Sequence, residues 1–152
     1  MSAQAANPGS AQFNRGNTAW LGHLDVGPTG GTLAIDAHDR GFQQFSVHIP
    51  PDAVQTETRF AVGFNDGTFK PVSGEASGTV VVIDSGAVHT FRQPVTITLQ
   101  RDPAAHKGVP VGFALEDNGK VRLLDLVFDR GSGKLTFYTF RPLTFTWVYA
   151  RP

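Results

Sequence analysis

The chain has 152 residues, 13 Lys and Arg against 13 Asp and Glu, and no cysteine. This length suits one domain with its own core, and the missing cysteines exclude disulfides, thiolate metal ligands and a cysteine nucleophile. A formal net charge of zero, with the charges interspersed, argues against nucleic acid as a partner, because phosphate binding needs a surplus of basic residues. No apolar run approaches the roughly 20 residues of a membrane span, so no span is predicted.

The first eighteen residues are polar, with Phe13 as their main apolar side chain. Such a composition does not fold alone, so we expect residues 1–18 to be an extended arm that lies on the domain or on a neighbouring chain. Residues 19–152 are expected to form a single domain. The triplet Ala3-Gln4-Ala5 resembles the end of a signal-peptidase site, although a full secretory signal is missing. Localisation therefore stays open between the cytoplasm and a cell surface or virion.

Alternation of apolar and polar residues, which is typical of half-buried strands, runs from Trp20 to the end of the chain. The alternation is clearest at 44–49, 95–100 and 143–147, while the run 80–83 is apolar throughout and indicates a central strand. No apolar stripe of helical length appears. The side chains predicted to face the core are Phe45, Val47, Ile49, Val95, Ile97, Leu99, Phe113 and Leu115.

Turn residues separate these runs at short intervals, as in GPTGG at 27–31, NDG at 65–67 and DNG at 117–119. Asn or Asp followed by Gly supplies the positive φ angles that hairpin turns need. About nine short strands result. The predicted fold class is therefore all-β, an antiparallel β-sandwich of Greek-key, Ig-like type with an extended N-terminal arm.

Three motifs in chain order resemble those of the β-sandwich module found in ankyrins, netrin receptors, zonula occludens proteins and many bacterial surface proteins. GGTL at 30–33 precedes SVHIPPDAV at 46–54, SGAVHTFRQPVTITL follows at 85–99, and the late pair EDNGKVRLL at 116–124 and KLTFYTFRPLTFTWVYA at 134–150 closes the series. The resemblance covers residues 30–150. It implies a sandwich fold and supports a role in protein interaction.

Relatives of that module cleave themselves at a His-Phe-Ser in the last strands, where the serine attacks the preceding carbonyl. Alignment of the final strands puts Pro142-Leu143-Thr144, or one residue earlier Arg141-Pro142-Leu143, on that tripeptide. The first register keeps a hydroxyl at Thr144 but replaces the histidine with proline, and the second loses both groups. A nucleophile needs an adjacent base, so we expect no self-cleavage.

Other catalytic and metal-binding patterns are weak. The five histidines lie far apart with no His-x-His or His-x-x-x-His pair for a transition metal, and Asp36, His38 and Asp39 lack the spacing of a calcium loop. No Gly-x-Ser-x-Gly occurs, whereas paired carboxylates for glycoside chemistry are not excluded by spacing. We therefore predict no enzyme activity, no catalytic residue, no metal site and no cofactor.

The leading hypothesis is a non-catalytic interaction or assembly module on a surface, virion or scaffold, whose arm ties it to a neighbouring subunit or a copy of itself. The alternative is a ligand-binding module, with carbohydrate as the favoured ligand, and an autoproteolytic or hydrolytic domain comes third. Aromatic side chains can supply contact area to a protein or a sugar, although Trp147 and the others also fit a core. The candidate interaction residues are Phe13, Trp20, Tyr138 and Tyr149.

Overall fold

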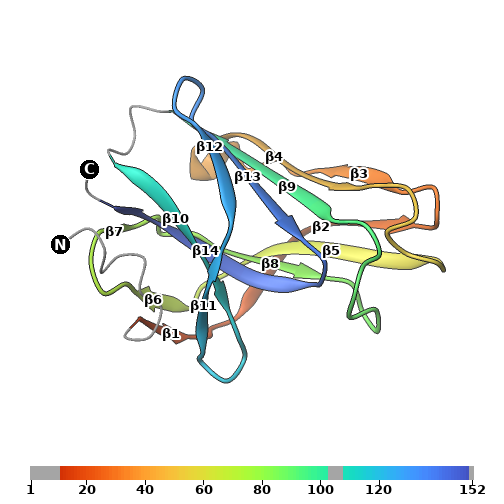
Figure 1. Cartoon of the computed structure of the whole chain (residues 1–152), viewed down its shortest axis with the longest axis horizontal. Helices are drawn as coiled ribbons and strands as arrows, with labels where there is room; N and C mark the ends of the chain where they lie inside the picture. The colour runs from red at the N-terminus through yellow and green to blue at the C-terminus, as the bar shows by residue number, and fades with distance from the viewer. Residues whose placement is uncertain (1–10, 103–107, 151–152) are drawn as a thin grey trace.

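The computed structural model describes residues 11–102 and 108–150, and these form two facing β-sheets with a small third sheet beside them (Figure 1). Fourteen strands lie in the described residues, together with one short 3-10 turn, η3 (His38–Arg40). All of the strand pairs are antiparallel. The fold is therefore the all-β sandwich that the alternating sequence predicts.

The larger sheet has seven strands. Its order, from one edge to the other, is β11 (Val121–Leu124), β10 (Val109–Leu115), β14 (Leu143–Ala150), β8 (Val80–Asp84), β5 (Thr58–Asn65) and β2 (Thr18–Val26), and β7 (Glu75–Ala76) adds to the end of β14.

The second sheet has five strands in the order β12 (Leu126–Asp129), β13 (Lys134–Thr139), β9 (Val95–Arg101), β4 (Phe42–Ile49) and β3 (Gly31–Ala34). A two-stranded sheet pairs β1 (Gln12–Asn14) with β6 (Thr68–Lys70). The chain passes between the large sheets several times, for instance from β4 to β5, from β8 to β9 and from β13 to β14. Strands that are distant in the sequence therefore become neighbours.

The main core fills the space between the two large sheets. Each predicted inward residue of β4 and β9 is buried there, and the same holds for Val81 and Ile83 of β8. Successive side chains of a strand point to opposite faces, so the residues between these face outward. Phe42 also lies in the main core, because the register of β4 shifts between Phe42 and Gln44. The inward prediction for Phe45, Val47, Ile49, Val95, Ile97 and Leu99 is confirmed.

Phe113 and Leu115 are also buried, but against a second cluster on the outer face of the seven-stranded sheet. There they pack with Val80, Val148 and Phe13, and the β1–β6 pair covers this cluster. Figure 1 shows that pair below the sheet. The apolar run 80–83 is explained by this second cluster, since Val80 packs in it while Val81 faces the main core.

The strand count is higher than the nine predicted from sequence. Several extra strands are only two to four residues long, such as β1, β6 and β7, and runs this short carry no measurable alternation. The run 121–129 divides into two strands at Asp125, and β11 joins one large sheet while β12 joins the other.

The described residues of the predicted N-terminal arm contact the rest of the same chain. β1 lies inside the proposed arm 1–18 and pairs with β6 of the same chain, and β2 already begins at Thr18. Phe13 is 6% exposed within the second cluster. The described part of the arm is therefore built into its own domain, and residues 1–10 lie outside the described residues.

Candidate functional site

One half of the outer face of the seven-stranded sheet is covered by β1 and β6, and the other half is open. Two adjoining cavities of about 360 Å³ and about 470 Å³ lie on the open half, and Asp84 lines both. Each volume is within the range of about 300–1,000 Å³ that is usual for small-molecule sites. We call the two cavities together the groove. It runs across the strands from Trp20 on β2 to Arg122 on β11.

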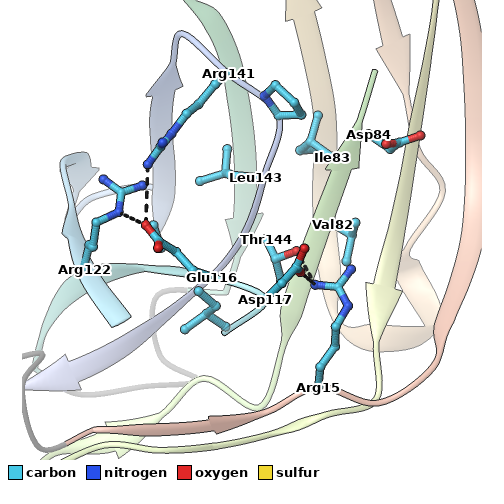
Figure 2. A pocket seen from close by; sticks show the side chains of 13 residues that line it. Arg15, Val82, Ile83, Asp84, Glu116, Asp117, Arg122, Arg141, Leu143 and Thr144 are labelled. Carbon is cyan, nitrogen blue, oxygen red and sulfur yellow. Dashed lines mark hydrogen bonds and ion pairs between the residues drawn. The ribbon is translucent and has the colours of Figure 1, made fainter. Parts of the chain in front are cut away.

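Two arginines converge on one carboxylate at the β11 end of the groove (Figure 2). Arg122 donates from Nε to Glu116 Oε1 over 2.6 Å, while Arg141 Nη2 lies 3.9 Å from the same oxygen. That separation is an ion pair and is too long for a hydrogen bond. The Arg141 side chain is half exposed, so its guanidinium N–H groups remain available to an anion in the groove.

The turn after β10 sets the position of Glu116. Its backbone N–H donates to Lys120 O over 2.8 Å, and Gly119 N–H donates to Glu116 O over 3.0 Å. Gly119 has a φ of 84°, the left-handed region that favours glycine. The Asp-Asn-Gly turn predicted from sequence is therefore the element that holds Glu116 and Asp117 at the rim.

Arg15 forms the wall of the groove on the N-terminal side. Its Nη1 donates to Asp117 Oδ1 over 3.0 Å and to Thr144 Oγ1 over 3.1 Å, and Figure 2 shows the side chain reaching between them. Arg15 lies 102 and 129 residues away from these partners. Sequence reasoning missed this residue, because no local pattern relates it to the last strands.

Trp20 closes the other end of the groove, where β2 departs from regular pairing. The register with β5 shifts between Trp20 and Gly22, so Leu21 is an extra residue in a β-bulge. Opposite the bulge stands Gly63, where a Cβ atom would lie 2.5 Å from Ala19 O. A glycine at this position therefore permits the close approach of the two backbones. Trp20 is 54% exposed.

The charged groups near Trp20 are of two kinds. Arg59 holds Asp25 with two hydrogen bonds, from Nε over 2.8 Å and from Nη2 over 3.1 Å, and these bonds lower the pKa of Asp25. Asp84 instead has no hydrogen bond or ion pair from its carboxylate to any other part of the described chain, and Figure 2 shows it standing apart from the arginine clusters. Its oxygens face solvent and the groove.

Thr144, the residue aligned with the self-cleavage nucleophile, lies at the floor of the groove. Its side chain is buried, and its hydroxyl accepts the hydrogen bond from Arg15. Among the described residues, no histidine lines the cavity that contains Thr144. The neighbour of this hydroxyl is thus a cation, whereas activation for nucleophilic attack would need a base at that place.

The four candidate interaction residues separate into two groups. Trp20 and Tyr138 are exposed, on opposite outer faces of the sandwich, whereas Phe13 and Tyr149 are each only 6% exposed. Phe13 packs in the second cluster, and Tyr149 Oη accepts a hydrogen bond from Trp147 Nε1 over 3.1 Å in the main core. Trp147 and Tyr149 are thus core residues and cannot join a sugar-stacking platform.

A different kind of surface covers the outer face of the five-stranded sheet. Strand pairing places Thr32, His48, Thr96 and Tyr138 in one row, and Ala34, Ser46, Thr98, Thr136 and Val127 in the next. Every one of these side chains is exposed or half-buried, and none is Asp, Glu, Lys or Arg. We call these two rows the uncharged face. Sequence analysis named only Tyr138 from this set, because rows form across strands.

The described ranges contain neither a helix long and apolar enough to cross a membrane nor a group of three or more His, Cys, Asp or Glu suited to a metal ion. Comparison of the chain with protein-family models finds no match, and comparison with curated proteins finds none. The described surface thus offers two features that another molecule could contact, an open groove that carries both charges and an uncharged face.

Proposed function

We propose that the protein is a non-catalytic assembly module and that two copies associate through the uncharged face. The observation that carries this proposal is that two adjacent rows of exposed or half-buried side chains, one across four strands and one across all five, contain no Asp, Glu, Lys or Arg. The centre of a protein interface is depleted in charged residues and enriched in aromatic residues. Val127 is 58% exposed and Tyr138 48% exposed, and they supply apolar contact at one end.

A second copy is the occupant that fits this surface. Burial of an unpaired charge is costly, and two such faces meet without burying one. Strand spacing gives the face a size of about 24 Å across five strands and about 14 Å along the two rows, or on the order of 300 Å² per copy as a flat projection. Counted over both copies, that area lies below the roughly 1,200 Å² at which specific stable interfaces begin, and it is typical of weak, transient contacts. We therefore expect a weak dimer that forms with increasing concentration.

Thr98→Arg tests the proposal, because Thr98 lies in the middle of a row on the central strand β9. Sedimentation velocity over a concentration series should show dimer for the parent chain and only monomer for this variant. Thr68→Arg, which places the same charge on exposed Thr68 of β6, is the matched control and should dimerise as the parent does. A parent chain that stays monomeric at every concentration would refute the proposal.

The N-terminal segment enters the proposal only through residues 1–10. Truncation after residue 10 keeps β1 and Phe13, whereas truncation after residue 18 would remove them from the second cluster. We expect the shorter deletion to leave the unfolding temperature unchanged and to weaken association. Identical association constants with and without residues 1–10 would show that the arm takes no part in the interface.

We also propose that the chain is a divergent member of the β-sandwich module of ankyrins, netrin receptors and zonula occludens proteins, without self-cleavage. The order of the motifs at 30–33, 46–54 and 85–99 supports this relation. The interaction role of that module agrees with an assembly function. A solved relative with the same strand order and with these motifs in the same strands would test the relation.

A second candidate function is carbohydrate binding, and the exposure of Trp20 at the end of the groove favours it. An indole ring that is half uncovered beside a cavity can stack on the apolar face of a sugar. Saturation-transfer NMR with neutral oligosaccharides would test this candidate. Binding that survives Trp20→Ala would contradict it.

A further inference from the structure

We propose that the groove binds an acidic saccharide, with one sugar ring stacked on Trp20 and a carboxylate held by Arg141. This inference rests on the second candidate function, carbohydrate binding, and gives its ligand class. It is independent of association through the uncharged face, which lies on the opposite side of the sandwich. The proposal depends on three side chains that keep polar or apolar surface open to a ligand in the groove: Trp20, Asp84 and Arg141.

The anion site follows from the arrangement of Arg141. Its guanidinium makes an ion pair with Glu116 Oε1 at 3.9 Å, a separation too long for a hydrogen bond, while Arg122 donates to the same oxygen over 2.6 Å. Arg141 thus brings a positive charge and a planar fork of donors that suit a carboxylate. The Arg15 guanidinium is already engaged by Asp117 and Thr144, so it shapes the wall.

Asp84 supplies a hydrogen-bond acceptor for the hydroxyl groups of the saccharide. Its carboxylate lines both cavities and accepts hydrogen bonds only. A second anionic group beside it would be repelled, whereas sugar hydroxyls would donate to it. The groove therefore combines one place for an anion, at Arg141, with one place for hydroxyl donors, at Asp84.

The sheet underneath the groove favours a saccharide over an acidic peptide. β8 is paired with β14 on one side and β5 on the other, so its backbone N–H and C=O groups are already used. A peptide gains affinity on a sheet mainly by main-chain pairing at an open edge, and the middle of this sheet offers none. A saccharide instead presents hydroxyls to side chains and a C–H face to an aromatic ring.

The size of the groove sets the expected length of the ligand. The two cavities, about 360 Å³ and about 470 Å³, adjoin at Asp84. An elongated ligand of two or three rings would place its aromatic contact and its anion contact at opposite ends. A monosaccharide would reach only one of them and should bind more weakly.

The test uses aldotriouronic acid, a xylobiose that carries a single glucuronic acid, as probe and its methyl ester as the matched neutral ligand, with the full chain in isothermal titration calorimetry. We expect the acid to bind at least tenfold more tightly than the ester at low salt, and this preference to shrink in high salt. Arg141→Gln should remove the preference while leaving ester binding unchanged. Trp20→Ala should weaken both ligands by tenfold or more, and Tyr138→Ala, an exposed aromatic on the opposite face, should change neither.

Each other result overturns the inference in a recognisable way. If acid and ester bind equally, the groove binds carbohydrate but not by charge, and only the acidic class fails. If neither binds at millimolar concentration, carbohydrate binding fails with it. Binding of a hexa-glutamate peptide in place of the sugar would assign the groove to an acidic peptide. Thermal unfolding of every variant, expected to match the parent because the changed side chains are exposed, separates lost binding from lost folding.

Discussion

The side-chain amide of Asn65 forms hydrogen bonds with both backbone polar groups of Gly16. Gly16 N–H donates to Asn65 Oδ1 over 2.9 Å, and Asn65 Nδ2 donates back to Gly16 O over 3.0 Å. The same amide also donates to Thr18 Oγ1 and accepts from Gly67 N–H. Asn65 is buried, so these bonds are shielded from water. The last residue of β5 thus holds the N-terminal segment on the domain and positions Arg15 at the groove.

Asn65→Ala is expected to lower the free energy of unfolding by about 2–4 kcal/mol, because it removes four part-buried hydrogen bonds made by one buried side chain. Amide hydrogen exchange at residues 12–18 should accelerate more than exchange in β9. Asn118→Ala, in an exposed turn, is the control and should change stability much less. Unchanged exchange at 12–18 would show that β1 holds the segment without Asn65.

Ile97→Ala in the main core and Phe113→Ala in the second cluster test whether both clusters are needed for the same cooperative fold. Each side chain is almost fully buried, and deletion should cost roughly 2–5 kcal/mol through lost burial and a cavity. Chemical denaturation should show one transition in both variants. A separate early transition in Phe113→Ala would mean that the second cluster unfolds on its own.

Arg101 is expected to tolerate lysine poorly. Its guanidinium lies 4.1 Å from the centre of the Phe42 ring and donates to Ser77 O over 3.1 Å and to Thr79 Oγ1 over 2.7 Å. A lysine ammonium cannot stack on the ring and donate in both directions at once. Arg101→Lys should therefore cost about 1–3 kcal/mol, measured by urea denaturation.

The control for this change is Arg130→Lys, which lies in an exposed turn. It should leave the urea midpoint unchanged within error. Equal midpoints for the Arg101 and Arg130 variants would show that the charge alone, and not the planar fork, matters at position 101.

Burial raises the pKa of Tyr149 above its ordinary value of 10.0. The folded chain therefore keeps the phenol protonated where the unfolded chain has begun to lose the proton. This contribution to stability is fully present below pH 10 and is lost as the pH rises through the folded-state pKa. In a Tyr138→Phe background, absorbance at alkaline pH should show Tyr149 ionising later in the folded chain than in urea. Coincident titration curves would contradict the burial effect.

The chain is expected to stay intact on incubation. Thr144 has a buried hydroxyl that accepts from Arg15, and the preceding residues are Pro142 and Leu143. Activation of a hydroxyl needs a base beside it. Intact-mass measurement over several days should show a single species, and two fragments divided between Leu143 and Thr144 would disprove this expectation.

Short-range sequence patterns predicted the secondary structure and most of the core. Alternation predicted β4, β9 and β14. The Asp-Asn-Gly sequence predicted the turn that follows Glu116. Patterns of this kind depend only on a strand having one apolar face. They could not distinguish which face of which sheet a residue covers, so Phe113 was assigned to the core without its second cluster, and buried Tyr149 was placed among candidate interaction residues.

The sequence by itself determined an all-β domain without thiol chemistry and with balanced charge, because composition and period-two alternation are properties of neighbouring residues. Only the tertiary structure decided that Arg15 meets Asp117 and Thr144, that Trp20 lies beside Asp84, and that nine uncharged side chains form two rows on one face. Strand order brings these residues together from distant parts of the chain. A surface made in this way leaves no periodic signal in any one segment.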